Sequence, residues 1–191
     1  MAHPELLPRD GPLLFQRPDD PVPSTSIPWR RRLAEYNHGG GNPERLLDAA
    51  HLYSPGIYQD LLGHVGKESF FILSAGWGLV RSSFLLPDYD ITFSSQAEPP
   101  KRRNERDVFC DFNHLDEAEV STQDTIYFFG GKDYLSLYYR LAHHLSGRKV
   151  IYFAARSIPQ HGAFEYLQYG GRGTNWHYRC ARDFVDGRVP R

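Results

Sequence analysis

Two carboxylates and a phenol lie within one short turn of this sequence. Asp88, Tyr89 and Asp90 directly follow Pro87, which favours a turn at this point. A carboxylate in a site can orient a water molecule and stabilise positive charge that grows on a sugar as its base departs. Asp90 and Asp88 are therefore candidate catalytic residues, and Tyr89 is a candidate for stacking on a flat ring. The alternative is that both carboxylates are solvated turn residues.

A tryptophan between two glycines precedes that turn. Gly76 and Gly78 let the backbone turn sharply or approach a ligand closely, and Trp77 is held between them. We expect Ser74, Gly76 and Trp77 to bind a substrate, with Ser74 reading the edge of a base and Trp77 stacking on its face. The same residues would also suit a core tryptophan beside a tight turn.

A polar loop near the N-terminus offers a third carboxylate. Gln16, Arg17 and Asp20 precede Pro21, and proline ends any helix or central strand at this point. If the sheet is parallel, this loop opens onto the same edge as Ser74. Asp20 is then a reserve catalytic carboxylate, and Gln16 and Arg17 are candidate substrate-binding residues.

A glycine-rich loop near the C-terminus carries groups that can stack and form hydrogen bonds. It holds Arg172, Asn175 and Trp176, and Arg156 lies in an earlier loop. Trp176 is a candidate for stacking on a base, Asn175 for reading its edge, and the two arginines for binding phosphates. The alternative is a C-terminal helix docked by Trp176.

These groups depend on a predicted parallel sheet for their positions. Residues 70–73 are four consecutive apolar residues, which predicts a strand buried on both faces in the middle of such a sheet. Ligands gather beyond the carboxyl ends of parallel strands, where Ser74 would lie. The strand, helix, strand order predicts an α/β fold with right-handed crossovers. The other expected elements are strands over 12–16, 125–129 and 149–155, and helices over 42–52, 56–65 and 134–145, from Asp116, and from Thr174 to about Asp186.

Composition favours one globular domain. The 191 residues suffice for a single core, so we expect one domain over 1–191, with 1–42 an irregular proline- and glycine-rich segment packed on it. No apolar run reaches the roughly 20 residues that cross a bilayer, so no membrane partner is expected. The chain starts without the basic and apolar segments of a secretion signal and contains two cysteines, Cys110 and Cys180. We therefore predict a cytoplasmic protein with no metal and no cofactor.

Charge allows local but not general contact with nucleic acid. The net charge of -1 and the pI of about 6.7 argue against a basic coat over the whole surface. Two basic triplets, at 30–32 and 101–103, either follow a phosphate backbone or form solvated surface. Aromatic residues make up 14% of the chain, which would suit the holding of unstacked bases, although most should be core.

The run ILSAGWGLV at 72–80, followed by LPDYD at 86–90, resembles the signature of the YaaA-like proteins and of uncharacterised bacterial and phage relatives. The resemblance covers about 55–93. It implies a three-layer α/β/α fold with a mainly parallel central sheet, related to the uracil-DNA glycosylases. The loop at 16–21 has a vaguer resemblance to the water-directing loop of those glycosylases, from which its order of residues departs.

Together these features favour an enzyme that hydrolyses an N-glycosidic bond. We expect a DNA glycosylase that acts on a normal or modified base, with DNA rather than RNA as its partner, and the phage relatives suggest a role in phage defence. A non-catalytic nucleic-acid-binding stress protein of the YaaA type is one alternative. A hydrolase of free nucleotides is another. The oligomeric state stays open.

Overall fold

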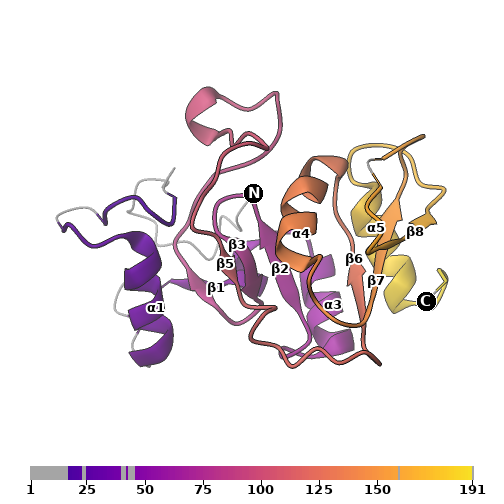
Figure 1. Ribbon diagram of the computed structural model, residues 1–191, viewed down its shortest axis with the longest axis horizontal. Helices are drawn as coiled ribbons and strands as arrows, with labels where there is room; N and C mark the ends of the chain where they lie inside the picture. Colours follow the sequence, from indigo (N-terminus) through magenta and orange to yellow (C-terminus); the bar gives the residue numbers. More distant parts are fainter. Residues whose placement is uncertain (1–16, 23–24, 40–41, 43–45, 159, 191) are drawn as a thin grey trace.

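The protein is a mixed α/β structure in which two three-stranded sheets stand next to each other (Figure 1). The computed structural model describes residues 17–22, 25–39, 42, 46–158 and 160–190. The predicted strand over 12–16 and the candidate residue Gln16 lie outside these ranges. The helices are α1 (Trp29–Gly39), α2 (Ala49–Leu52), α3 (Ile57–Val65), α4 (Leu135–Ala142) and α5 (Trp176–Val185). The strands are β1 (Leu47–Asp48), β2 (Phe71–Ser74), β3 (Gly78–Arg81), β4 (Leu85–Leu86), β5 (Phe112–Asn113), β6 (Thr125–Phe128), β7 (Arg148–Phe153) and β8 (Glu165–Gln168).

The first sheet has the order β2-β3-β5 and is built on a hairpin. β2 pairs with β3 in antiparallel register, with Ser74 opposite Gly78, and β3 pairs with β5 in parallel register. The prediction that residues 70–73 form the middle strand of a parallel sheet is therefore wrong. Gly78 has a φ of +89°, which suits glycine, so the chain reverses over 75–77 and returns as a strand.

The second sheet is parallel throughout and confirms part of the prediction. Its order is β6-β7-β8, with Thr125 opposite Arg148 and Val150 opposite Glu165. β6 lies within the predicted strand at 125–129, and β7 overlaps the predicted strand at 149–155 but starts one residue earlier and ends at Phe153. β8 was not predicted, because only its two middle residues are partly buried and its ends are exposed. β1 and β4 form a separate small antiparallel pair.

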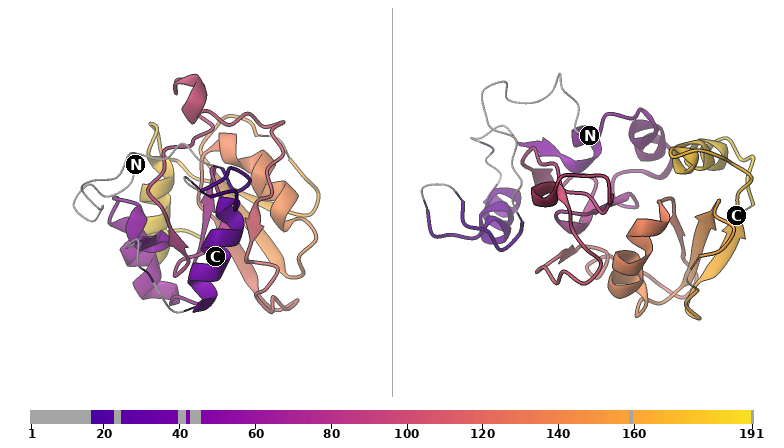
Figure 2. Two further views of the ribbon diagram at one scale, coloured as in Figure 1. Left: turned by 90° about the vertical axis from the view of Figure 1, so that its left-hand side faces the viewer. Right: turned by 90° about the horizontal axis from the view of Figure 1, so that it is seen from above.

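Helices lie on both sides of the strands. Figure 2 shows α3 and α5 together on one side of the second sheet and α4 on the other. The predicted helices at 56–65 and 134–145 are confirmed as α3 and α4, although α4 is shorter and follows a 3-10 turn (Lys132–Tyr134). α5 confirms the C-terminal helix, but it starts after Asn175 and has no side-chain cap.

Three other predictions about helices are corrected. Residues 29–39 form α1, so the segment 1–42 is not irregular throughout. The described part of 42–52 is helical only in α2, whose N-cap is Asp48. The side-chain amide of Asn42 donates to the carbonyl of Leu46 and accepts from its backbone N–H, both at 2.7 Å. No helix starts at Asp116, where the chain forms turns.

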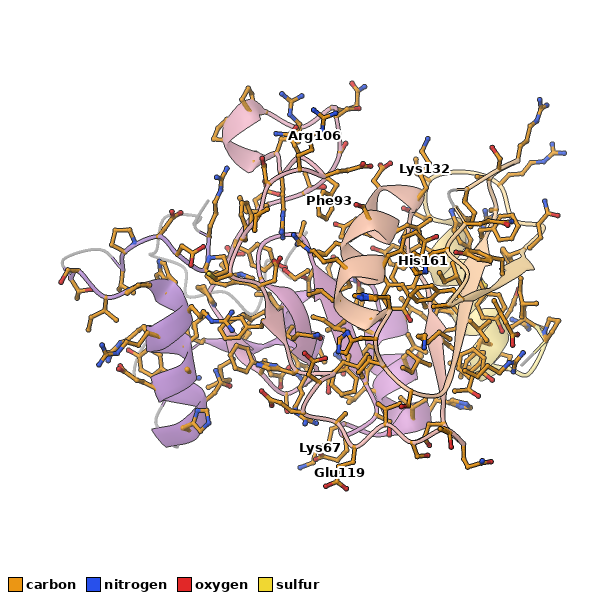
Figure 3. All side chains as sticks on the ribbon, viewed as in Figure 1. Lys67, Phe93, Arg106, Glu119, Lys132 and His161 are labelled. Carbon is orange, nitrogen blue, oxygen red and sulfur yellow. The ribbon has the colours of Figure 1, made fainter. Side chains whose placement is uncertain are left out.

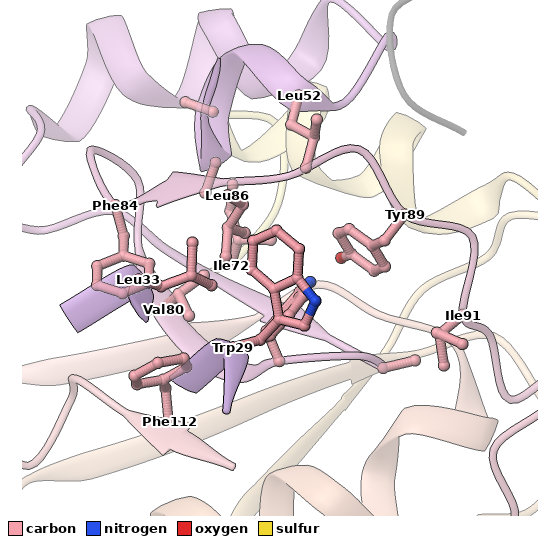
Figure 4. Close-up of a cluster of buried hydrophobic side chains, with 14 of the residues drawn as sticks. Trp29, Leu33, Leu52, Ile72, Val80, Phe84, Leu86, Tyr89, Ile91 and Phe112 are labelled. Carbon is pink, nitrogen blue, oxygen red and sulfur yellow. The ribbon is translucent and has the colours of Figure 1, made fainter. Parts of the chain in front are cut away.

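The main core surrounds Trp77, which is 0% exposed. The edge of its ring meets Trp29 at a centroid distance of 6.5 Å and Tyr89 at 6.0 Å. Figure 4 shows Tyr89 and Ile91 beside this cluster, so the 87–91 turn is part of the core packing. Two smaller clusters pack the second sheet, one against α4 and one against α5.

Candidate functional site

A cleft separates the two sheets. It has a volume of about 1190 Å³, which lies slightly above the usual range for small-molecule sites. β2 forms one wall and β6 the other, and residues of α3, α4 and α5 also line it. The cleft is therefore the place where the described parts of the two sheets could share a ligand.

Polar residues line both ends of the cleft: Glu68, Arg81 and Glu119 are among those at one end, and the other end lies at the carboxyl ends of β2 and β6. Asp90 and Thr92 line it from the segment after the hairpin, and Gly130, Gly131 and Asp133 line it from the turn after β6. We call this end the mouth. Figure 3 shows Phe93, Arg106 and Lys132 toward this edge and Lys67 and Glu119 at the opposite one. Polar residues such as Asp90 and Asp133 therefore do lie beyond the carboxyl ends of these strands, where ligands bind in parallel sheets.

Hydrogen bonds join the hairpin turn to the 87–91 turn. Ser74 Oγ accepts from the backbone N–H groups of Gly76 (3.1 Å) and Trp77 (2.9 Å), and it lies 2.6 Å from the hydroxyl of Tyr89. The Tyr89 hydroxyl also bonds that of Tyr53. A Cβ at Gly76 would lie 3.0 Å from the Tyr89 ring, so only glycine fits there without a shift. Two of the predicted turns therefore meet.

A cluster of tyrosines lines the cleft beside this junction. Tyr53 stacks on Tyr58 at 5.1 Å, and Tyr58 meets Tyr178 of α5 at 6.1 Å. Tyr134, at the start of α4, meets Phe93 edge-on at 5.0 Å. Burial raises the pKa of Tyr53, Tyr58, Tyr89 and Tyr134. These phenols stay neutral at physiological pH and can act as hydrogen-bond donors.

The two candidate carboxylates of the turn have different surroundings. Asp90 lines the cleft and forms an ion pair with Lys101 at 3.1 Å, and this bond raises the pKa of Lys101. Asp88 does not line the cleft. Its Oδ1 is buried without a hydrogen-bond partner among the described residues, and burial raises the pKa of this carboxyl group. Of the two, only Asp90 is placed to meet a ligand in the cleft.

A buried ion-pair network joins the 94–107 loop to the hairpin turn beside the mouth. Arg103 donates to Asp111 at 2.7 and 2.8 Å and to the carbonyl of Ala75 at 2.9 Å. Arg140 donates to the same carboxylate at 2.6 Å. The side chains of Arg103 and Asp111 are 1% and 3% exposed. Arg103 therefore anchors the hairpin turn, which corrects the idea that the whole triplet at 101–103 faces a phosphate backbone.

The first basic triplet is also engaged within the protein. Arg30 donates to the carbonyl of Cys110 and lies 4.4 Å over the Phe112 ring. Arg31 and Arg32 both pair with Glu35 along α1, at 3.2 and 3.5 Å. These contacts support the solvated-surface interpretation of this triplet.

Trp77 cannot stack on a ligand as placed, because both faces of its ring are buried. The expectation of a stacking role is therefore corrected to a role in the core. Ser74 and Gly76 are buried as well and do not line the cleft, so they support the turn from inside rather than contact a ligand. Tyr89 lines the cleft but is 8% exposed and packs on Trp77, so its expected stacking role is also corrected to a role in the core. A tryptophan next to glycines suits either role, and only the packing distinguishes them.

The N-terminal loop lies away from the cleft. Arg17 stands 4.8 Å over the Phe109 ring, and Asp20 accepts a hydrogen bond from the backbone N–H of Arg17 at 2.9 Å. Cys110 N–H donates to Asp19 at 3.2 Å, which ties the loop to the segment before β5. Asp20 therefore holds its own loop, and nothing places it on the cleft.

The C-terminal loop emerges at the same edge but does not line the cleft. Since β6, β7 and β8 are parallel, the segments after β7 and β8, with Arg156 and Arg172, leave the sheet where Gly130 does. Both arginines and Asn175 are exposed, and Trp176 packs on Tyr169 at 6.2 Å. The third predicted turn thus shares the edge with the other two, and its helix reaches the cleft only through the residues that follow Trp176.

Sequence reasoning missed several residues of the mouth. Tyr53, Tyr58, Tyr134 and Tyr178 come from four separate segments, and no spacing in the sequence connects them. Asp133 follows Gly130 and Gly131 in the sequence, and a glycine turn before a carboxylate does not by itself indicate a cleft. The one available signal was the high aromatic content, which says nothing of position.

The comparisons with known proteins assign no family to this chain. Family models, curated proteins and solved structures were each compared with the chain, and none matches it. Every step from the site to a function therefore comes from the residues themselves. No helix in the described ranges is both long and apolar enough to cross a membrane.

Proposed function

We propose that the protein hydrolyses the N-glycosidic bond of a nucleobase in DNA, at the mouth of the cleft. The observation that carries this proposal is the position of Asp90, whose carboxylate lines a cleft walled by tyrosines and stands beside the ammonium of Lys101. In this reaction the bond from the sugar C1′ to the base breaks and its electron pair leaves with the base. Positive charge grows on the sugar, and water adds to C1′.

Each group at the mouth has a part in this proposal. The Asp90 carboxylate orients the water, accepts its proton and stabilises the charge on the sugar. The exposed part of the tyrosine cluster, with Tyr134 and Phe93, provides a flat wall for a base that has left its stack. Neutral phenols can donate hydrogen bonds to the oxygen and nitrogen atoms of the base edge.

Cations on the same edge supply the attraction for a phosphate backbone. Lys132 and Arg106 lie toward the mouth in Figure 3, and the segments that carry Arg156 and Arg172 leave the sheet at this edge. Lys101 is close enough to Asp90 to hold a phosphate next to the reacting sugar. DNA that follows these groups would present one nucleotide to the cleft.

The fold of the second sheet supports the same class. Its three parallel strands have α4 on one side and α3 with α5 on the other (Figure 2). We propose that the chain is a three-layer α/β/α protein of the uracil-DNA-glycosylase type. A cytoplasmic location is part of this proposal, and the free cysteines Cys110 and Cys180 agree with a reducing compartment.

A hydrolase of free nucleotides is the second candidate. It is favoured by the engagement of Arg30 and Arg103 within the protein, which leaves fewer cations for a long backbone. The chemistry at Asp90 would be the same. The two candidates differ in how many phosphates this edge must bind: those of one nucleotide, or those of a DNA backbone.

The test is base release from duplexes that contain normal and modified bases. After incubation, heating in alkali breaks the strand wherever a base has been lost. We expect breaks with the wild type and at least about a 100-fold lower rate with Asp90→Asn, while affinity for the duplex is kept. Asp20→Asn is the matched control, because it removes the same charge away from the cleft and should keep the rate.

Other outcomes separate the candidates. Base release from free nucleotides but not from duplexes selects the second candidate. Salt-sensitive duplex binding with no base release from either substrate refutes both and leaves a binding protein. Equal rates for Asp90→Asn and the wild type refute the assigned role of Asp90.

A further inference from the structure

Three hydroxyl groups form a hydrogen-bonded chain that leads from the hairpin turn to the cleft. Ser74 Oγ lies 2.6 Å from the hydroxyl of Tyr89, which in turn bonds the hydroxyl of Tyr53. Ser74 is 1% exposed and Tyr89 is 8% exposed, whereas Tyr53 is only partly buried and lines the cleft. Tyr53 is therefore the end of the chain that a ligand in the cleft meets.

The backbone of the hairpin turn sets the direction of these hydrogen bonds. The N–H groups of Gly76 and Trp77 donate to Ser74 Oγ at 3.1 and 2.9 Å and occupy both lone pairs of this oxygen. Ser74 can then only donate, and its hydrogen faces Tyr89. The Tyr89 oxygen accepts that hydrogen and directs its own to Tyr53, since buried hydroxyls are normally paired. Every hydrogen of the chain is thus directed toward the cleft, and the last one belongs to Tyr53.

The ring of Tyr53 is held in position by its neighbours. It stacks on Tyr58 at a centroid distance of 5.1 Å and meets the Tyr89 ring edge-on at 6.4 Å. The helix before it is fixed as well, because the N–H of Ala49 donates to the carbonyl of Phe84 at 2.9 Å. A donor on a fixed ring distinguishes ligands by the position of their acceptor atoms.

The charge state of the two phenols preserves this donor. Burial raises the pKa of Tyr53 and of Tyr89, so both keep their hydrogen at physiological pH. A deprotonated Tyr53 would be an acceptor instead. Its oxygen already accepts the hydrogen of Tyr89, which makes it a poor acceptor for a second group.

We propose that Tyr53 is a specificity-determining residue, which donates a hydrogen bond to an acceptor atom on the edge of the bound base. The inference rests on the proposed function in taking a nucleobase as the ligand. An exocyclic oxygen at this position accepts the hydrogen, whereas an exocyclic amino group would place two donors against each other. Such a site rejects the mismatched ligand because its own polar group is left unpaired. Tyr89 and Ser74 act through Tyr53 as positioning residues.

Equilibrium binding of two purines to the full-length protein, measured by isothermal titration calorimetry, tests this role. Hypoxanthine carries an oxygen where adenine carries an amino group, and the two are almost equal in size. We expect the wild type to bind hypoxanthine about 10-fold more tightly than adenine. Tyr53→Phe should weaken hypoxanthine binding about 10-fold and change adenine binding less than about 2-fold.

Tyr89→Phe separates a positioning role from a structural one. It frees the Tyr53 oxygen to accept a hydrogen bond, so adenine binding should become at least about 3-fold tighter and the preference for hypoxanthine should shrink. Tyr166→Phe is the matched control, because Tyr166 donates to the hydroxyl of Tyr139 at 3.0 Å and does not line the cleft. It should leave both affinities at the wild-type values.

Equal or reversed wild-type affinities for the two purines would overturn the inference. A preference that survives Tyr53→Phe, or binding of neither purine, would overturn it as well. No bond breaks in this experiment, so its outcome is independent of catalysis. A hypoxanthine preference in a protein that releases no base refutes the proposed reaction alone, whereas base release that depends on Asp90 without this preference refutes only the role of Tyr53.

Discussion

Replacement of Asp111 by alanine should cost several kcal/mol, because this carboxylate neutralises a buried guanidinium. Arg103 loses both of its hydrogen bonds to Asp111, at 2.7 and 2.8 Å, and keeps those to the carbonyls of Ala75 at 2.9 Å and Asp107 at 3.4 Å. Breaking a buried ion pair on one side costs about 3–5 kcal/mol. Because these two carbonyl contacts remain, the cost of Asp111→Ala should be near the lower value. At about 2–4 °C per kcal/mol, the melting temperature should fall by about 6–12 °C.

Urea unfolding followed by circular dichroism measures this loss directly. Glu35→Ala is the matched control, since it removes a carboxylate from an exposed pair with Arg31 and should cost below about 0.5 kcal/mol. Joint replacement by Arg103→Met and Asp111→Leu should recover part of the loss, because no unpaired charge stays buried. A loss below about 1 kcal/mol for Asp111→Ala would refute the claim that this network anchors the mouth.

Two further predictions concern the backbone and the pH. Gly78→Ala should lower the free energy of unfolding by more than about 2 kcal/mol, because φ is +89° and a Cβ would meet the carbonyl oxygen of Phe112 at 2.4 Å. Gly173→Ala has a similar φ of +88° and open space, so its urea midpoint should move less, and equal shifts would contradict the steric argument. Burial lowers the pKa of His177 from the ordinary 6.5, so below that pH the unfolded chain binds a proton that the folded protein excludes. Stability should therefore fall between pH 7.5 and 5.5, and His177→Phe should weaken this fall in urea titrations at both pH values; an unchanged fall would refute the role of His177.

The parallel sheet could be predicted because its signal is local. β6 and β7 each contain a short run of apolar and aromatic residues, and in β7 the four residues at 149–152 are buried, which is the pattern of a strand covered on both faces. The sequence does not distinguish the β2–β3 hairpin from a strand that ends in a turn. Gly76 and Gly78 are compatible with either, and the outcome depends on the contact of Gly78 with β5.

Sequence reasoning indicated residues of the cleft only where they are close in sequence. Tyr89 and Asp90 both line the cleft, and one turn carries them, whereas the other tyrosines that line it come from distant segments. The residue types of Trp77 and of the triplet at 101–103 suit bases and phosphates, but they suit a core and a solvated surface as well. The burial of Trp77 and Arg103 follows from tertiary packing around the hairpin turn, which residue type and spacing do not encode.

Mass spectrometry of the small molecules released from a duplex tests the central claim most directly. The account predicts that the wild type liberates a free nucleobase from an intact sugar-phosphate backbone, and that Asp90→Asn does so at least about 100-fold more slowly. Release of the same base at the same rate by both proteins, or no free base from any duplex or nucleotide, would contradict it.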